Sequence, residues 1–307
     1  MAMNPALPAG AIALSAVLWG TWWWPMRLLD AQGLGVAWAS LVIYATATAF
    51  LAPFAWARRR HLRAGGGLLV GVGASLGILL VLWNLAVVLG DVVRVTLLFY
   101  LTPIWATLLA RFVLHETIGR LRAAAIAAGL GGAAVVLGVP GETAVPLPHG
   151  AGDWLGLACG MIFAVSLTLA RLGSRTSADG ETQGLGGFEQ SFVAFVFGAA
   201  GCALWVALDP SAAPPGRAVV AGAPLAAAIA LVWLLPQTIL VLWGAARFDP
   251  GRTAILMLLE VIAASVSATI VAGDLLSGRD LTGCALILVA GALEAQSLRR
   301  PPPTRAA

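Results

Sequence analysis

Ten apolar runs, each close to the length of one membrane crossing, dominate this sequence. A bilayer core of roughly 30 Å needs about 20 apolar residues per helical crossing. Backbone groups cannot stay unpaired in hydrocarbon, so runs of this length are predicted to be helices. The sequence therefore predicts an all-α polytopic membrane protein with ten transmembrane helices, at residues 7–28, 34–56, 68–89, 94–114, 121–139, 154–172, 187–208, 221–245, 251–272 and 281–298.

Composition excludes a water-soluble domain. The 307 residues are 60% hydrophobic and 10% charged, far from the usual mixture in soluble proteins. The net charge is +4, but the arginines are spread among short interhelical segments, so no nucleic-acid partner is predicted. The lipid bilayer is the predicted surrounding.

The arginines also predict the orientation, because short cytoplasmic loops accumulate positive charge. With the N-terminus inside, most arginines fall on the cytoplasmic side and Arg111 lies within a span near its inner end. Both termini are therefore predicted to be cytoplasmic, in a bacterial inner membrane. The arginines left on the outer side are Arg27, Arg94, Arg217 and Arg279.

A weak internal repeat divides the chain. Asp91 and Arg94 open the fourth span, and Asp249 and Arg252 open the ninth with the same spacing, 158 residues later. Five helices is an odd number, so two such halves cross the membrane in opposite directions, as in many secondary transporters. We therefore predict two inverted five-helix repeats at 1–139 and 153–298, joined by a proline-rich connector at 140–152 and followed by a cytoplasmic tail at 299–307.

Glu260 is the acidic residue that this interpretation places deep in a span. A carboxylate there is costly, so it is expected to face the interior of the bundle. It is a candidate for proton coupling or for binding a substrate ammonium. The alternative is a packing role, in which the carboxyl bonds the backbone of a neighbouring helix.

Prolines and amides within the spans are further candidates. Pro103 lies mid-span and removes a backbone hydrogen bond, which favours a gate or a static kink. Pro236 offers a comparable break in the eighth span, and Pro25 lies near the outer end of the first. Asn84 and Gln237 are candidates for binding the polar ends of a zwitterion, with interhelical hydrogen bonding as the alternative.

Aromatic residues fall into two groups. Those at span ends are typical of the membrane interface: Trp22, Trp23, Trp24, Trp56 and Trp154. Those deeper in the spans need a hydrogen-bond partner or a cavity for their polar atom, and they are the predicted lining of a substrate path: Trp19, Trp83, Tyr100, Trp105, Trp233 and Trp243.

Three motifs resemble the drug/metabolite transporter superfamily. The segment 97–117 (LLFYLTPIWATLLARFVLHET) is similar to the end of each repeat in that family, and 258–274 (LLEVIAASVSATIVAGD) looks like its second copy. In EamA-type members the second copy often reads Leu-Glu-Pro, whereas Val261 stands at the proline position and Asp274 replaces the closing glutamate. The first span contains Trp19-Gly20-Thr21, which resembles the family's Trp-Gly-Ser/Thr signature.

The resemblance implies a ten-helix fold with a central cavity. Tyr100-Leu101-Thr102-Pro103 is most like the YddG-type amino-acid exporters. For that branch, the resemblance implies efflux of amino acids. The partners expected are a small-molecule substrate and the lipid bilayer, with the protein a monomer or weak dimer.

The function expected from these features is secondary transport. The main hypothesis is an exporter of amino acids or closely related metabolites working by alternating access, and the alternative within transport is efflux of drugs or amphiphiles. An intramembrane enzyme is a remote alternative, because the polar residues in the spans are scattered singly. No phosphate-binding loop and no cysteine or histidine cluster is present, so neither a cofactor nor a metal is predicted.

Overall fold

The computed structural model describes residues 6–116, 118–137, 148–178, 186–209, 216–272 and 277–299, and throughout these ranges the regular structure is helical, with no strand. Nine helical units there are long and apolar enough to cross a membrane, and a tenth long helix, α14, follows them. The protein is thus a multi-pass membrane protein. Its first half contains α1 (Ala6–Gly20), α2 (Trp23–Ala31), α3 (Val36–Ala57), α4 (Arg59–Leu89), α5 (Val92–Phe99), α6 (Thr102–Val113) and α7 (Arg120–Leu137).

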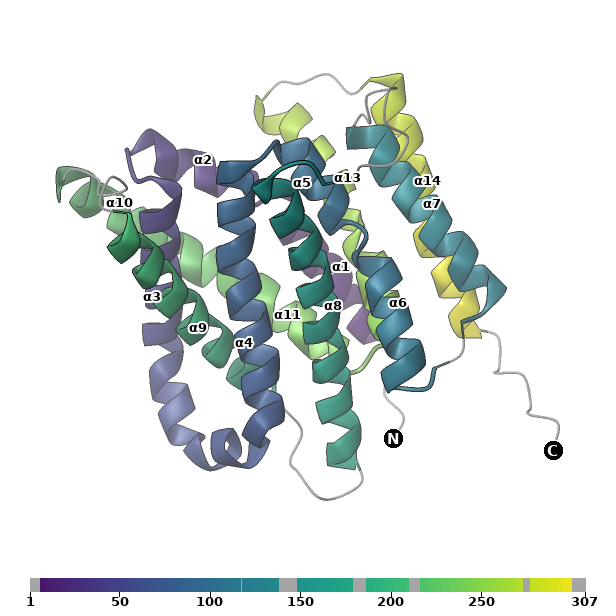
Figure 1. The fold of residues 1–307 in the computed structure, drawn as a ribbon, viewed down its shortest axis with the longest axis horizontal. Coiled ribbons are helices and arrows are strands. Elements are labelled where there is room, and N and C mark those ends of the chain that lie inside the picture. Colours follow the sequence, from purple (N-terminus) through teal and green to yellow (C-terminus); the bar gives the residue numbers. More distant parts are fainter. Residues whose placement is uncertain are drawn as a thin grey trace.

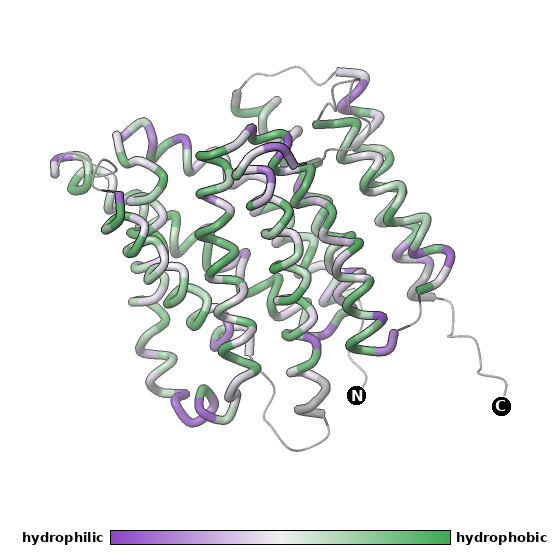
Figure 2. Tube along the Cα trace, in the orientation of Figure 1, coloured by the Kyte–Doolittle hydropathy of each residue, from purple (hydrophilic) through white to green (hydrophobic). Residues whose placement is uncertain are grey.

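The second half also contains both long and broken helices. The long helices run side by side, with their connections gathered at two opposite ends (Figure 1). Hydrophobic residues cover the helices along most of their length, and hydrophilic ones concentrate at those ends (Figure 2). The elements are α8 (Ala151–Ala178), α9 (Gly187–Leu208), α10 (Gly216–Ile229), a π-helical turn η2 (Ala230–Leu234), α11 (Leu235–Ala245), α12 (Pro250–Met257), α13 (Leu259–Ser267), a second π-helical turn η3 (Ala268–Ala272) and α14 (Gly278–Arg299).

Several crossings consist of two helical pieces. The first is interrupted between α1 and α2, the fourth at Tyr100 and Leu101 between α5 and α6, and the ninth at Leu258 between α12 and α13. The eighth crossing passes through η2 before α11 begins. The sequence predicted each of these crossings as one apolar run, with a proline kink or break expected in the fourth and the eighth.

The third crossing begins earlier than predicted. Its helix α4 starts at Arg59 instead of residue 68, and Gly66 lies inside it with φ +50° and ψ −143°. This conformation is rarely open to residues with a Cβ, so glycine is the residue that allows it. The polar turn after α3 and the membrane helix are therefore joined through one non-helical glycine.

Close packing holds the helices together. α4 packs against α8 and α9, α3 against α9, α1 against α11 and α13, and α7 along α14. Lipid tails are as apolar as the helices, so association depends on close approach through small residues. At Gly77 an added Cβ would overlap the Ala194 carbonyl, and Gly132 and Gly283 meet across α7 and α14 in the same way.

Candidate functional site

Two broken crossings meet inside the protein. A small cavity of about 10 Å³ lies where the α5–α6 break faces the α12–α13 break. That volume is close to the minimum that holds one water molecule, so the site is closed to any larger solute. Its lining is formed by Phe99, Tyr100, Thr102, Pro103, Phe163, Ala254, Met257, Leu258 and Glu260.

Glu260 and Tyr100 pair across this cavity. Both side chains line the cavity and lie close enough to interact, and Tyr100 is 9% exposed. Glu260 lies in the first turn of α13, directly after the break. The structure therefore brings together two predicted site residues that are far apart in the sequence and places them at the junction of the two halves.

At the α5–α6 break, the Thr102 side chain pairs with backbone carbonyl groups. Thr102 donates from its hydroxyl to the Phe99 carbonyl at 2.6 Å, and the same hydroxyl lies 3.3 Å from the Gly160 carbonyl of α8. Pro103 is the second residue of α6, where the missing N–H costs no helical bond. Thr102 and Glu260 have the same 158-residue spacing as the two capping aspartates, so they occupy corresponding places after the two breaks.

Two glycines press other helices against the breaks. An added Cβ at Gly20 of α1 would overlap the Glu260 carbonyl, and one at Gly160 of α8 would lie 2.8 Å from the Phe99 carbonyl. Gly20 of α1 thus covers the break between α12 and α13, and Gly160 of α8 covers the break between α5 and α6. The Trp-Gly-Thr motif contributes the first of these glycines.

We expect Gly20→Ala to destabilise the protein by about 1–3 kcal/mol, because the new methyl group must push α1 away from the Glu260 carbonyl and Ala263. Gly10→Ala is the matched control, since it lies on the same helix with no atom within 4 Å of the added Cβ. The midpoint of thermal unfolding in detergent measures both. An equal midpoint for the two variants would contradict the close contact.

The predicted aromatic residues do not all reach the cavity. Trp83 packs against Phe99, 5.0 Å between ring centroids, and so lies one layer behind it. The Trp233 indole donates to the Leu18 carbonyl at 3.0 Å. Trp243 lies under the Arg247 guanidinium, 4.3 Å from the ring centroid, near the end of α11.

Trp19 and Trp105 lie at internal positions that suit binding. Their indole nitrogens are buried and have no hydrogen-bond partner within the described ranges. The same holds for both amide atoms of Gln237, which is fully buried. Buried polar groups normally have partners, so these three side chains have hydrogen-bonding capacity that the present conformation leaves unused.

The remaining predicted residues lie elsewhere. The Asn84 amide donates to the Ser40 hydroxyl at 2.9 Å and to the Tyr44 hydroxyl at 3.2 Å, which joins α4 to α3. Pro236 is the second residue of α11, directly after η2. Pro25 is buried near the start of α2. The prolines thus mark the beginnings of helical pieces.

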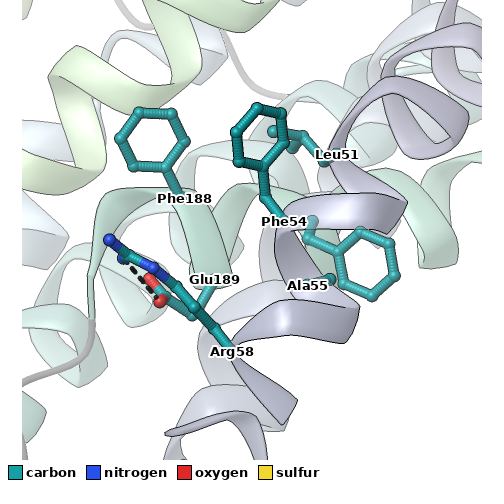
Figure 3. A pocket seen from close by; sticks show the side chains of 7 residues that line it. Leu51, Phe54, Ala55, Arg58, Phe188 and Glu189 are labelled. Carbon is teal, nitrogen blue, oxygen red and sulfur yellow. Dashed lines mark hydrogen bonds and ion pairs between the residues drawn. The ribbon is translucent and has the colours of Figure 1, made fainter.

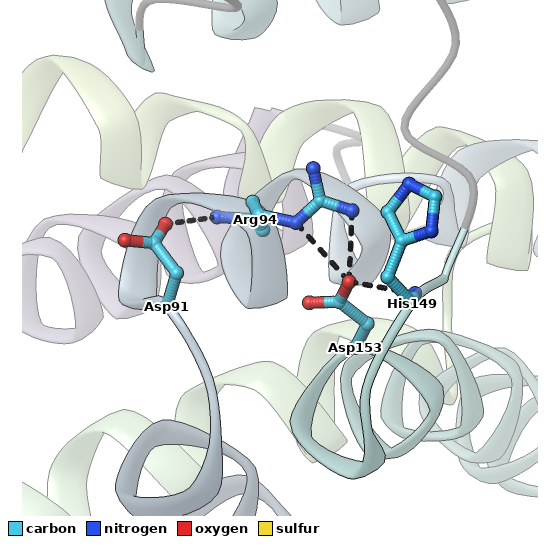
Figure 4. Close-up of polar contacts among 4 residues, drawn as sticks. All are labelled: Asp91, Arg94, His149 and Asp153. Atoms are coloured by element: carbon cyan, nitrogen blue, oxygen red, sulfur yellow. Dashed lines mark hydrogen bonds and ion pairs between the residues drawn. The ribbon is translucent and has the colours of Figure 1, made fainter. Parts of the chain in front are cut away.

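An ion pair joins α5 to α8 at one end of the bundle. Asp91 caps α5 by accepting from the Arg94 backbone N–H at 3.0 Å, and the Arg94 side chain reaches Asp153 at 2.8 Å (Figure 4). The His149 backbone N–H also donates to Asp153, at 3.0 Å. The N-terminal ends of α5 and α8 are thereby fixed to each other.

A more deeply buried network occupies the corresponding place in the second half. Asp249 caps α12 by accepting from the Arg252 backbone N–H at 3.0 Å, and its other oxygen accepts from Arg122 at 3.2 Å. Arg252 pairs with Glu294 of α14 at 2.9 Å. Burial alone would raise the pKa of Asp249, but Glu116, Arg122 and the Arg252 backbone outweigh burial and hold that pKa below its ordinary value.

The structure corrects one sequence expectation here. Glu260 was expected to be the one acid deep in a span, but Glu294 lies within the predicted tenth span and is 1% exposed. Its burial arises because α14 packs against α7 and α12, which a single run of sequence does not reveal.

The comparisons agree with this architecture. A solved crystal structure superposes on the chain with a TM-score of 0.70 and 21% identity, over 95% of this chain and 98% of its own, which shows a shared fold. Curated protein sequences give no match. Residues 7–138 match the EamA-like transporter family, a family of membrane transporters within the drug/metabolite superfamily. The chain therefore carries an EamA-like transporter domain in its first half, within one multi-pass fold that spans both halves.

Proposed function

We propose that this protein is a secondary transporter that exports amino acids or closely related small metabolites across the bacterial inner membrane by alternating access. The meeting of the two broken crossings at Glu260 and Tyr100 carries this proposal. Transporters of this kind place the substrate near the midplane, between discontinuous helices of two repeats. The domains proposed are the two inverted repeats, 1–139 and 153–298, with the connector and tail outside them.

The helix contacts support the inverted repeat. In the proposed repeat, α1 corresponds to α8, α4 to α11, and α5 and α6 to α12 and α13. The contact between α8 and α4 then corresponds to that between α1 and α11. The contacts of α8 with α5 and α6 correspond to those of α1 with α12 and α13. All of these contacts are present. The capping aspartates and the glycines at the breaks follow the same exchange.

Opening of the central site is the proposed transport step. The cavity of about 10 Å³ cannot hold an amino acid, so the α5–α6 and α12–α13 crossings must separate to admit one. The breaks beside Pro103 and Leu258 allow the pieces of each crossing to change their angle. Movement of α1 or α8 away from the breaks would then expose the site to one side at a time.

The chemistry near the site suits a zwitterion. Glu260 offers a carboxylate for a substrate ammonium at the cavity, and Gln237, Trp19 and Trp105, which lie outside its lining, hold unused hydrogen-bonding atoms that opening of the site could bring to a substrate. The aromatic and aliphatic walls suit a side chain of modest size. The resemblance of 100–103 to the YddG-type exporters adds support for amino acids as the substrate class.

A flux panel tests the proposal. Liposomes containing the purified protein are loaded with individual labelled amino acids. Efflux, with and without a pH gradient, is compared with that from equally loaded liposomes that lack the protein. We expect efflux of at least one amino acid at a rate well above that of the protein-free liposomes. Absence of protein-dependent flux for every amino acid and related metabolite, under either gradient, would overturn the proposal.

Efflux of amphiphiles is a second candidate, and a groove supports it. An apolar groove of about 550 Å³ lies between α1 and α13, with Leu288 of α14 at its edge. Such a groove gives an amphiphile lateral access from the lipid to the region beside Glu260. Unlabelled amphiphilic cations added to the flux assay distinguish the candidates, because a shared path requires competition with the labelled amino acid.

A further inference from the structure

The first crossing is broken at a place where its counterpart in the second half is continuous. α1 ends at Gly20 and α2 begins at Trp23, because the ring of Pro25 clashes with the carbonyl four residues before it and offers no N–H. The helix α8 runs on past Gly160, which packs on the other break as Gly20 does. Counted from Gly160, the place of Pro25 is taken by Val165. The two halves therefore differ where the first crossing leaves the central site.

Trp233 of η2 contacts both pieces of the first crossing. At the break, the Trp22 backbone N–H donates to the Trp19 carbonyl, so the Leu18 carbonyl has lost its helical donor. The Trp233 indole donates to that carbonyl at 3.0 Å. Its ring packs edge-on against Trp24 of α2, with 5.9 Å between the ring centroids. The break is thus a hinge, and Trp233 lies against it.

A hydrogen bond joins α2 to α13 near the central site. The Trp23 indole donates to the Ser267 hydroxyl at 2.9 Å, and Ser267 is the last residue of α13, about two turns beyond Glu260. At the level of Glu260 itself, Gly20 touches the Glu260 carbonyl, and Glu260 lines the cavity. Separation of α1 and α2 from α13 therefore uncovers Glu260.

α1 and α13 already have an open space between them. The apolar groove of about 550 Å³ lies there, and Thr21 and Ser267 are both part of its lining. The contact at Gly20 and the bond from Trp23 thus join two helices that are apart along the groove. Loss of the bond is expected to ease their separation.

The neighbours of α2 allow it to move as one piece. It ends at Gly33, whose φ of +77° suits glycine, so the chain changes direction at both ends of α2. The following helix, α3, is held at its far end, where Arg58 donates to Glu189 of α9 at 3.0 Å (Figure 3). α2 lies at the opposite end of the bundle, beside α10 (Figure 1). Bending at the hinge can therefore move α2 and leave α3 in place.

We propose that α2 is the movable gate of the central site and that the bond between Trp23 and Ser267 is its latch. The inference rests on the proposed transport function, since a gate serves a protein that passes a solute. In this structure the latch is closed, and the cavity of about 10 Å³ admits no substrate. When the bond breaks, α2 swings about the hinge, and the end of α1 at Gly20 is free to leave the Glu260 carbonyl. The unbroken α8 has no such piece, so opening toward the other side requires movement of whole helices.

The labelling rate of one cysteine in the central cavity tests the proposal. Ala254 lines the cavity and is 2% exposed, so Ala254→Cys provides a thiol that a water-soluble maleimide reaches only when the site opens. Labelling of the full-length protein in detergent is followed at residue 254 by peptide mass spectrometry. Cys284→Ser removes the partly buried native thiol, and Cys159 and Cys202 are fully buried. We expect Trp23→Phe to raise the labelling rate about two- to tenfold, the change in open fraction that follows from losing one hydrogen bond.

Matched variants show whether the bond itself matters. Ser267→Ala removes the acceptor and is expected to raise the rate to the same extent, and the double variant to raise it no further, because the same bond is lost in every case. Trp56→Phe makes the same exchange at an exposed tryptophan of α3 and is expected to leave the rate unchanged. Ser267→Ala alone decides the question if Trp23→Phe fails to fold. An unchanged rate in a folded Trp23→Phe or Ser267→Ala protein, or increases that multiply in the double variant, would overturn the latch.

Labelling needs no substrate, so its outcome is separate from that of the flux panel. Flux that is present while Trp23→Phe leaves labelling unchanged contradicts the latch but not transport. Faster labelling in a protein without flux of any amino acid or related metabolite supports the latch and contradicts the proposed substrates.

Discussion

Glu260→Gln is expected to abolish the dependence of flux on a pH gradient while the protein stays folded. Glutamine retains the size and polarity of glutamate, but it cannot bind and release a proton. Glu260 is the acid that lies at the meeting of the two breaks. The ratio of flux with a pH gradient to flux without one, measured in proteoliposomes, is expected to fall to about 1.

Two controls make this result specific. Asp30→Asn removes an acid exposed near the end of α2 and is expected to leave the ratio unchanged. Tyr100→Phe removes the phenol hydroxyl beside Glu260 but no carboxyl, so some dependence on the gradient is expected to remain. If Glu260→Gln retains the wild-type ratio, Glu260 has no part in coupling, and the alternative of a packing role is favoured.

Arg122→Met is expected to cause the largest loss of stability, about 3–5 kcal/mol. Removing one partner of a buried ion pair leaves the other charge uncompensated. The side chains of Arg122 and Asp249 are each 5% exposed, with 3.2 Å between Nη1 and Oδ2. The measurement is the midpoint of thermal unfolding in detergent, which should drop markedly relative to wild type.

The exposed Arg63→Met variant is the matched control, because it removes an arginine outside the network and is expected to leave the midpoint almost unchanged. The double variant Arg122→Met with Asp249→Asn should recover part of the loss, since the amide still accepts at the start of α12 but carries no charge. If Arg122→Met matched the control, the network would not contribute to stability.

Much of the fold could be predicted from the apolar runs. The seventh span was predicted at 187–208 and is α9 with the same bounds, and within the described residues each other predicted span coincides with one helix or with consecutive helical pieces. Length and hydropathy suffice here, because the bilayer imposes one crossing length on every helix. The candidate site was predicted in part, since Tyr100, Pro103 and Glu260 were selected and lie around one cavity.

The positions of the helix breaks were harder to predict from the sequence. Leu258 interrupts the ninth crossing without a proline or glycine at that position, so no local signal marks it. The break is compatible with the fold because α1 meets it through Gly20, a tertiary contact that a single sequence does not display. Pro103 gave a local signal, and there a break was among the expected outcomes.

The pairing of α12 with α14 has a consequence for biosynthesis. Arg252 leaves the ribosome well before Glu294, and each carries a charge that is costly to place against lipid alone. The pair forms only when α14 lies beside α12 and α7. Helix α14 is therefore expected to enter the bilayer against helices that are already assembled, instead of integrating on its own.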